Sequence, residues 1–447
     1  MSDISSALSV AQRLIHVLDH FDLPKAHFGL RYPADLVGLL EHAPTRIASV
    51  VLQGATGRPE AFAPVAAHTL WVLGDAGPSG QMRARLEALS PANVHWITHY
   101  PEFLWSDTAV DHTEELASTM LQFLQRMDAE DTLPTVSLSG AGEVAGVTYA
   151  AAGRGTPVVL LPLGLSSQQW TPVLPHLQAH HCTIVLSGPY LKPVEQLETR
   201  AAGGYTRMAL HLLDLARPHA GAALIEVGCG TGALLRRIVR HTGMPRVTGL
   251  DINGFLLKEA LALAVQEGLG DRLLFKQGSA EAVPFPDNAF DIVYSCTVME
   301  EVDADRMLAE MVRVAKPGGR VAVGVRAVDR GQWTNLPLPA PLKAKIEEPV
   351  GAAGAGGGMS AQGCADASLY RRFQKAGLQA IEGGPAWAWN WARPDNVVWR
   401  SSLEQQMRDM LTPAEDQTWL HAMQQAQADG LPVWIARPFH CAVGTKP

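Results

Sequence analysis

The stretch Leu224-Ile-Glu-Val-Gly-Cys-Gly-Thr-Gly232 and the pattern that follows it decide the fold of the second half of the chain. Residues 222–227 are apolar apart from Glu226, which is typical of a strand covered on both faces. The three glycines free the backbone and leave room for a ligand against bare main chain. From residue 234 to 239, apolar side chains recur at helical spacing. A strand, a glycine turn and a helix N-terminus together predict a nucleotide-type site in an α/β sheet.

Composition places this site in a soluble globular protein. The chain has 447 residues, 47% of them hydrophobic and 18% charged, which predicts two or three domains with sizeable cores. The net charge of -8, without a basic run, argues against a nucleic-acid partner. The five cysteines show no CxxC spacing, so neither a metal site nor a disulfide framework is expected.

The chain also lacks the marks of a secreted or membrane protein. The N-terminus is an amphipathic helix pattern and not a signal peptide, and no apolar run is long enough for a membrane span. We therefore expect a cytoplasmic enzyme without a membrane span.

The first 130 residues alternate strand and helix patterns. Apolar strands are expected at 47–52, 69–73 and 94–97, with helical patterns between them, and this predicts a parallel α/β sheet. The segment 131–143 is rich in Ser, Thr, Gly and Pro and predicts a linker. A further buried strand follows at 156–161.

This order of elements resembles the two halves of an α/β-hydrolase in swapped order. The family's nucleophile elbow, G-x-S-x-G, has its counterpart in Gly29-Leu-Arg-Tyr-Pro33. Arg31 stands at the nucleophile position and cannot attack an ester, and Gly77 stands where the family has its acid. His99 is the only triad member with a counterpart, and one member is not a triad.

The resemblance extends to the segment after residue 156. Pro162-Leu-Gly164 occupies the place of the family's His-Gly, which helps to form the oxyanion hole. The resemblance therefore implies a circularly permuted, degenerate α/β-hydrolase-like domain over 1–192, made of halves 1–130 and 143–192. A generic small α/β domain is the alternative.

The glycine turn alone leaves the nucleotide open. Gly228, Gly230 and Ala233 also satisfy the dinucleotide fingerprint G-x-G-x-x-G/A. Asp251 ends a second strand about 20 residues further on, where a carboxylate can accept hydrogen bonds from both ribose hydroxyls in either case.

Four later segments separate the two interpretations. They are Ser279-Ala280 after a third strand, Val283-Pro-Phe-Pro-Asp-Asn-Ala-Phe-Asp291, Val298-Met-Glu-Glu-Val302, and Lys316-Pro-Gly-Gly319. In this order, over about 200–330, they resemble the class I S-adenosylmethionine-dependent methyltransferases, particularly the group similar to the ubiquinone/menaquinone C-methyltransferases. The resemblance implies a Rossmann-like seven-stranded sheet in a domain over 193–447, and it disfavours a nicotinamide oxidoreductase.

The resemblance also assigns roles around S-adenosyl-L-methionine. The glycine loop would pack on the amino-acid portion, Glu226 would orient the loop, and Asp251 would hold the ribose. Ile252 would flank the adenine, while Ser279, where the family usually has Asp, and the Ala280 N–H would meet its edge. Cys296 and Thr297 would lie where the methyl group points. The cofactor-binding residues expected are Glu226, Gly228, Gly230, Gly232, Asp251, Ile252, Ser279, Ala280 and Cys296.

Glu300 and Glu301 are the candidate catalytic residues. The family often has His at the position of Glu301, so a carboxylate pair would lie near the mouth of the pocket. The alternative is a solvated helix start, on which neighbouring acids would point about 100° apart. A general base is needed only where the acceptor must first lose a proton, because the sulfonium is already activated. Cys229 and Cys296 are expected to be inert.

The C-terminal third carries the acceptor side. The glycine-rich run 351–359 is expected to form a mobile lid or disordered loop. Trp387, Trp389 and Trp391 alternate, so on a strand they share one face that lines an apolar acceptor pocket or buries a domain or homodimer interface. The sequence thus predicts methyl transfer to an unidentified small-molecule acceptor. The alternatives are a cofactor-binding pseudo-enzyme and a hydrolase-type enzyme with a non-standard site.

Overall fold

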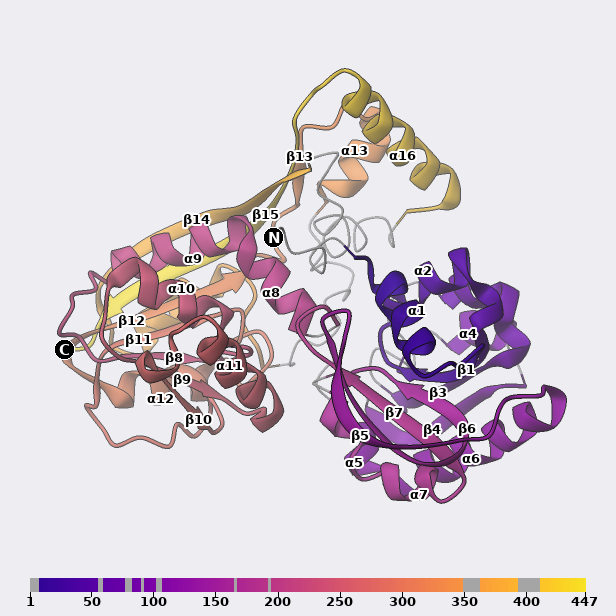
Figure 1. Cartoon of the computed structure of the whole chain (residues 1–447). Helices are drawn as coiled ribbons and strands as arrows, with labels where there is room; N and C mark the ends of the chain where they lie inside the picture. Colours follow the sequence, from indigo (N-terminus) through magenta and orange to yellow (C-terminus); the bar gives the residue numbers. More distant parts are fainter. Residues whose placement is uncertain are drawn as a thin grey trace. The chain divides into compact units, whose positions relative to one another are not determined.

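The chain folds into two α/β units. The computed structural model describes residues 8–54, 59–76, 83–89, 92–101, 107–164, 167–191, 194–348, 362–392 and 411–447. The chain divides into unit 1, Met1–Gln196, and unit 2, Leu197–Pro447. The sequence placed this boundary after residue 192. Helix α8 (Val194–Ala202) spans the division. Each unit is described by itself below (Figure 1).

Unit 1 is built on one mixed sheet in the order β4-β3-β2-β1-β6-β5, with β7 also paired to β6 (Figure 1). Strands β1 to β4 are parallel, as the strand and helix alternation predicts. The strands are β1 (Ala26–Leu30), β2 (Ile47–Gln53), β3 (Thr69–Ala76), β4 (Val94–Pro101), β5 (Val136–Val144), β6 (Val147–Leu160) and β7 (His181–Ser187). The helices are α1 (Val10–His20), α2 (Ala34–His42), α4 (Arg83–Leu89), α5 (Thr108–Asp111), α6 (Thr113–Glu130) and α7 (Leu174–Gln178).

Strand β6 serves as two strands because it bends at two glycines. Its first part pairs with β7 from Thr148–Ser187 to Gly153–Cys182, with residue numbers running in opposite directions. Its second part pairs with the same strand, β7, from Thr156–His181 to Leu160–Val185, and here the residue numbers rise together along both strands. A Cβ on Gly155 would lie 2.1 Å from the His180 carbonyl oxygen, so only glycine fits the bend.

The prediction of a linker at 131–143 is wrong. Most of this segment is β5, which forms a hairpin with β6 from Val136–Gly155 to Val144–Val147. The side chains of β5 are largely exposed, so small and polar residues are tolerated. Backbone pairing with β6 holds the strand at the sheet edge, and Val136, Leu138 and Val144 also pack against the core. The segment therefore connects the two halves of unit 1 within the sheet.

Unit 2 has the order β10-β9-β8-β11-β12-β15-β13, with β14 paired to β15 (Figure 1). Strands β8 to β12 are parallel, and β15 joins β12 in antiparallel register. The strands are β8 (Leu224–Val227), β9 (Val247–Asp251), β10 (Leu273–Gln277), β11 (Phe290–Cys296), β12 (Ala315–Arg326), β13 (Trp333–Thr334), β14 (Gln379–Ala392) and β15 (Val433–Thr445). The helices, besides α8, are α9 (Gly204–Leu215), α10 (Ala233–Thr242), α11 (Gly254–Gln266), α12 (Ala304–Val314), α13 (Ala340–Ile346), α14 (Ser368–Lys375) and α16 (Pro413–Ala428).

This is the predicted Rossmann-like methyltransferase sheet of seven strands, with the two-residue β13 as an addition. The first and last strands of the prediction, 222–227 and 433–445, are present as β8 and β15. Buried apolar residues cover both faces of the parallel strands, which explains why these strands read as continuous hydrophobic runs.

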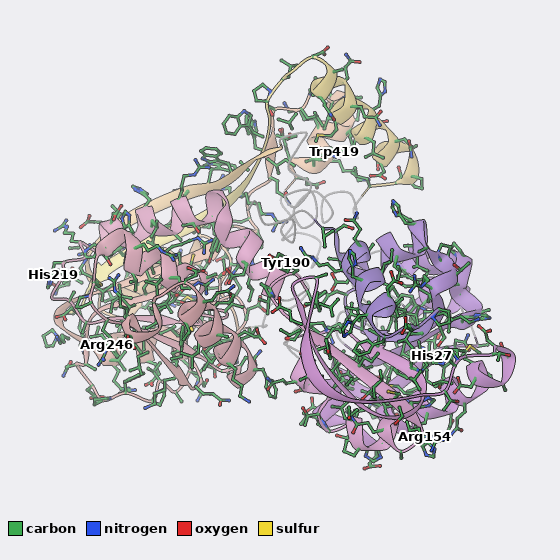
Figure 2. All side chains as sticks on the ribbon, viewed as in Figure 1. His27, Arg154, Tyr190, His219, Arg246 and Trp419 are labelled. Carbon is green, nitrogen blue, oxygen red and sulfur yellow. The ribbon has the colours of Figure 1, made fainter. Side chains whose placement is uncertain are left out.

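A separate small core lies at the far ends of β13 and β15. It packs α13 and α16 around Trp419, which is fully buried and labelled in Figure 2. Helix α16 begins with a capping box, in which Thr412 and Glu415 satisfy each other's backbone N–H groups. The glycine-rich run 351–359, expected to be a lid, lies outside the described residues. Among the described residues, no helix is both long and apolar enough to span a membrane.

Candidate active site

The glycine loop lies at the carboxyl end of β8, in the middle of the unit 2 sheet. Gly228, Gly230 and Gly232 have φ angles of +78°, +54° and +65°, which disfavour any other residue. A Cβ on Gly228 would lie 2.1 Å from Cγ2 of Val298. The loop is therefore a bare backbone cradle, as the sequence predicts, leading into the first turn of α10.

Asp251 holds the loop in place. One carboxylate oxygen accepts the Gly230 N–H at 2.7 Å, and the other accepts the Asn253 N–H at 2.9 Å. Burial raises the pKa of Asp251, and these backbone hydrogen bonds oppose the rise. A carboxylate can accept about four hydrogen bonds, so Asp251 retains capacity for a ligand hydroxyl.

Glu226 lies beside the loop with a carboxylate oxygen that lacks a partner. The residue is 3% exposed, and its Oε2 has no hydrogen bond among the described residues. Burial raises the pKa of Glu226 well above its usual value, and the nearby Asp251 charge adds to the rise. The loop-orienting role expected for Glu226 is thus performed by Asp251. Glu226 instead presents a buried carboxyl oxygen without a hydrogen bond among the described residues, and the Arg200 charge opposes the rise of its pKa.

The expected adenine side is partly open. Ile252, after β9, is 69% exposed, unusual for a large apolar side chain beside a binding loop. Ser279 is half-buried, and its hydroxyl accepts the Glu281 N–H at 3.1 Å. Ala280 is half-buried beside it. These residues offer an exposed apolar face and a short polar edge.

The end of β11 forms another wall of the candidate site. Cys296 is buried in the core, and a Cβ on Gly324 would lie 3.0 Å from its sulfur. Burial raises the pKa of Cys296 to about 12, so the thiol stays protonated and inert. Thr297 follows with a φ of +61°, and its hydroxyl lies 3.3 Å from the Tyr205 hydroxyl. Strained backbone at the end of a central strand marks a candidate functional position.

The interpretation of Glu300 and Glu301 as a solvated helix start is wrong. Both lie in the turn before α12, whose N-cap is Asp303. Glu300 is 0% exposed, and one of its oxygens accepts the Arg326 backbone N–H at 2.7 Å. Glu301 binds the guanidinium of the same arginine at 2.6 Å. The two acids converge on Arg326 because a turn, unlike a helix, lets neighbouring side chains reach one partner.

The two acids differ in what they can do. Burial raises the pKa of Glu301 to about 7, while Arg326 lowers it and Glu300 raises it. Glu301 has a second oxygen without a hydrogen bond among the described residues, as does Glu300. A half-buried carboxyl that titrates near neutrality is suited to exchange a proton, whereas the fully buried Glu300 is fixed to the backbone.

Several arginines that the sequence analysis did not single out lie near the end of β11. The Arg200 guanidinium lies 4.5 Å from the centre of the Tyr205 ring. Burial lowers the pKa of Arg437 on β15 to about 9, and the charges of Arg326 and Arg200 lower it further. No motif contains these residues, since they come from α8, β12 and β15. Only the sheet topology, which places β15 beside β12, could have revealed them.

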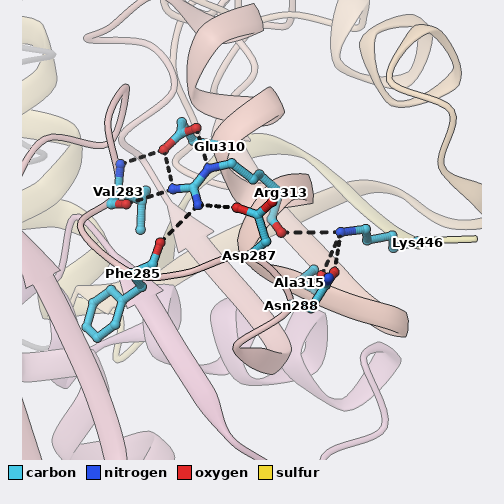
Figure 3. A network of polar contacts seen from close by, with 8 residues as sticks. All are labelled: Val283, Phe285, Asp287, Asn288, Glu310, Arg313, Ala315 and Lys446. Carbon is cyan, nitrogen blue, oxygen red and sulfur yellow. Dashed lines mark hydrogen bonds and ion pairs between the residues drawn. The ribbon is translucent and has the colours of Figure 1, made fainter.

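The segment 283–291 supports the site without lining it. Arg313, on α12, donates to the carbonyl oxygens of Val283 at 2.8 Å and Phe285 at 2.9 Å, and it pairs with Asp287 at 2.7 Å (Figure 3). Lys446 belongs to the same network and donates a hydrogen bond to the Asn288 side chain at 2.8 Å (Figure 3). These contacts therefore fix the segment 283–291, called the clamp segment below, between β10 and β11.

Of the residues singled out in unit 1, Arg31 follows β1 and His99 lies on β4, with β2 and β3 between these strands in the sheet, and Gly77 lies outside the described residues. Arg31 is 2% exposed and donates to the Gln53 side chain at 3.1 Å. His99 is exposed on β4, and no hydrogen bond joins it to Arg31 in the described part of the chain. The structure does bring the elbow segment beside Pro162–Gly164, because the Leu161 N–H donates to Gly29 at 2.8 Å and the Tyr32 hydroxyl donates to Gly164 at 3.2 Å.

Comparison with known proteins identifies the class of unit 2. Residues 225–323 match the family described as "Methyltransferase domain". This stretch contains the glycine loop, Asp251 and the clamp segment, and unit 2 is accordingly a methyltransferase domain of the class I fold.

Two curated relatives match part of unit 2. Sterol 24-C-methyltransferase ERG6B of Gibberella zeae is 43% identical over 100 residues, which cover 22% of this chain and 26% of that protein. Ubiquinone/menaquinone biosynthesis C-methyltransferase UbiE of Hahella chejuensis is 39% identical over 148 residues, covering 30% of this chain and 59% of that protein. The matched part is thus less than two thirds of either relative.

Among solved structures, a putative methyltransferase from Bacillus halodurans is similar, with 17% identity and a TM-score of 0.36. The alignment covers 54% of this chain and 98% of that one.

Proposed function

We propose that the protein transfers a methyl group from S-adenosyl-L-methionine to a small-molecule acceptor. The observation that carries this proposal is the glycine cradle beside the buried, unpartnered Glu226 carboxylate. S-adenosylmethionine has a sulfonium and an ammonium group, so its net positive charge suits this carboxylate, and its amino-acid portion suits a loop without side chains. The residues present therefore fit this cofactor.

The remaining predicted residues would hold the other parts of the cofactor. Asp251 would accept hydrogen bonds from the ribose hydroxyls, and Ile252 would cover one face of the adenine. Ser279 and the Ala280 N–H would meet the adenine edge. When bound, the cofactor supplies an activated methyl group for in-line displacement. The chain's own contribution is alignment of the acceptor and exclusion of water.

We assign different roles to Glu300 and Glu301. Glu300 is a positioning residue, because its oxygen accepts the Arg326 backbone N–H and it has no exposed surface. Arg326 in turn holds one oxygen of Glu301. Glu301, with a pKa of about 7, is the group that would take a proton from an acceptor that must lose one.

Calorimetry with the full chain tests the cofactor. S-adenosylmethionine and S-adenosylhomocysteine should both bind, and Asp251→Ala should weaken them by about 100-fold, since it removes both the ribose contact and the loop anchor (roughly 2.7 kcal/mol). Asp271→Asn, at an exposed acid remote from the loop, is the control and should bind normally. Binding of NAD with neither sulfur compound bound would reject the proposal.

The pH dependence of turnover tests Glu301. The acceptor is first found by profiling small-molecule extracts with a donor labelled at its methyl group. If Glu301 is the base, turnover should rise with pH through about 7, because the carboxyl must lose its proton to act. Glu301→Gln should lower the rate by about 100-fold and remove this step. An unchanged step in the variant would assign the proton transfer elsewhere.

We further propose that unit 1 is a permuted, degenerate α/β-hydrolase-like domain without hydrolytic activity. The join of the two halves at β1 and β6 supports this, as does the adjacency of Gly29 and Leu161. Arg31 at the nucleophile position argues against turnover. A panel of ester substrates should give no hydrolysis by the full chain, and hydrolysis that is lost in His99→Ala would contradict the proposal.

A further inference from the structure

Unit 2 contains a cavity of about 670 Å³ against α9 and α10. Four of its lining residues are basic: Arg207 from α9, and Arg237, Arg240 and His241 from α10 and its last turn. None of the lining residues is acidic. Such a concentration of positive charge is notable in a chain with a net charge of -8. The cavity includes no residue of the glycine loop.

Two of the four basic residues are neutralised by carboxylates. Arg240 pairs with Glu267 at 2.6 Å, and His241 pairs with Asp214 at 2.8 Å. The other two, Arg207 and Arg237, have no carboxylate within ion-pair distance among the described residues. The cavity therefore keeps two guanidinium groups that form no direct ion pair among the described residues, one on each helix.

Arg207 and Arg237 are held in place by other contacts. The Arg207 guanidinium lies over the Trp389 ring, 3.7 Å from its centre. Arg237 donates to the Ala233 carbonyl oxygen at 2.7 Å, one turn back along α10. Each side chain thus has a fixed orientation that leaves most of its five N–H donors for a ligand, which lowers the entropy cost of binding.

Arg236, next to Arg237 in the chain, does form direct ion pairs with acids. Arg236 is fully buried and is paired with both Glu198, on α8, and Glu267, at 2.8 Å from the latter. Both carboxylates pair directly with this structural arginine, whereas Arg237 beside it forms no direct ion pair among the described residues. Burial lowers the pKa of Arg237, and the charges of Glu198 and Glu267 oppose this shift without cancelling it.

We propose that this cavity binds a small molecule through a phosphate group, with Arg207 and Arg237 as the main contacts. Guanidinium groups match phosphate oxygens with paired N–H donors, and the cavity volume lies within the usual range for small-molecule sites. Arg240 and His241 line the same cavity, but each is already paired with a carboxylate. The site is separate from methyl transfer, and it stands whether or not the cofactor proposed above binds.

Calorimetry with pyrophosphate as the probe tests the site, with the full chain at constant ionic strength set by chloride. Pyrophosphate should bind, and Arg207→Gln and Arg237→Gln should each weaken it by about tenfold or more. Arg246→Gln is the matched control, since Arg246 is exposed, lies outside the cavity and is labelled in Figure 2. Its affinity should stay within about twofold of the original.

A second arm distinguishes a soluble phosphate ester from a lipid headgroup. Vesicles of phosphatidylcholine with and without phosphatidic acid are sedimented with the protein. Binding to phosphatidic acid that is lost in Arg207→Gln supports the site with a lipid source, whereas binding of pyrophosphate alone supports it with a soluble source. No binding of either probe, or equal weakening by Arg246→Gln, overturns the proposal. Arg207 is exposed, so its variant should fold even if the Arg237 variant does not.

Discussion

Strand β1 of unit 1 and strand β8 of unit 2 each lie among the parallel strands of a mixed sheet, yet different kinds of residue follow their carboxyl ends. After β1 come Arg31 and Tyr32, both buried, and their polar groups bind Gln53 and the Gly164 carbonyl. After β8 comes a loop of glycines beside Glu226, whose buried oxygen has no partner among the described residues.

The difference teaches how a sheet acquires a binding site. Parallel topology places strand ends and helix N-termini together in both units, but a ligand also needs space and polar groups that remain unsatisfied. In unit 1 the chain's own side chains occupy this position, since Gln53 accepts from Arg31 and donates to Thr108 at 2.6 Å. Burial also raises the pKa of Tyr32 to about 12, so it stays neutral. In unit 2 the same position is left for a ligand.

Among the tests of this contrast, Gly228→Ala should have the largest effect. The new Cβ would meet Val298 at 2.1 Å and would sit at a φ of +78°. Strain and overpacking together should lower the free energy of unfolding by about 4 kcal/mol and abolish cofactor binding. Gly243→Ala is the control, because its φ is +69° with nothing within 4 Å of the added carbon. It should cost only about 1 kcal/mol in urea unfolding and bind normally. Equal losses in both variants would show that the cradle is ordinary loop backbone.

The sequence was informative for this site wherever the determinants are local. The glycine loop, Asp251 and the strands around them follow from residues that are neighbours in the chain, and the structure places them as expected. Glu226 was assigned to orient the loop, but Asp251 does so, because the Gly230 N–H points toward β9 and not along β8. Which of two nearby acids accepts a given N–H depends on three-dimensional geometry that motif spacing does not contain.

Errors arose where long-range pairing decides the structure. The segment 131–143 has linker composition, but its backbone pairs with β6 and forms β5. Glu300 and Glu301 look like a helix start, but Arg326, 25 residues later, draws both into a buried turn. Likewise the segment 283–291 is a useful family signature, although the structure shows it to be a clamp around Arg313 (Figure 3).

The amino ends of the unit 1 strands reveal another feature that sequence reasoning missed. His27, labelled in Figure 2, lies between Ser49 at 2.7 Å and Asp128 at 3.0 Å. Thr156 bridges Asp128 and His181, at 3.0 Å and 2.8 Å. Ser49 and His27 are fully buried at the sheet end opposite Arg31, so this Ser-His-Asp chain is structural. Unit 1 thus pairs polar side chains with one another at both ends of its sheet, although Nε2 of His181 has no hydrogen bond among the described residues.

This network should make unit 1 acid-sensitive in a way that unit 2 is not. Burial lowers the pKa of His181 to about 4, against the opposing charge of Asp128. The unfolded chain therefore binds a proton at His181 as the pH falls below about 6.5, before the folded chain does, and stability falls. The loss should reach about 3 kcal/mol between pH 6.5 and 4.

Hydrogen exchange of the full chain measures this loss in peptides from β6 and β7. His181→Gln should flatten the pH dependence, whereas His180→Gln, at the exposed neighbour whose charge is the smallest cause of the shift, should change it only slightly. If the His180 variant flattens the dependence equally, His181 is not its source, and the contrast between the two units loses this part of its support.

The smallest expected effect concerns the adenine side of the unit 2 site. Ser279 stands where the resembling family has Asp, and its hydroxyl already accepts the Glu281 N–H. Ser279→Asp would keep that bond and add a charged acceptor, so S-adenosylmethionine should bind about fivefold more tightly (about 1 kcal/mol). Ser279→Ala should weaken binding by only about threefold, because a neutral hydrogen bond has a small net value. Calorimetry on both variants checks this, and a tenfold or greater loss in the alanine variant would mean that the serine hydroxyl is a principal contact.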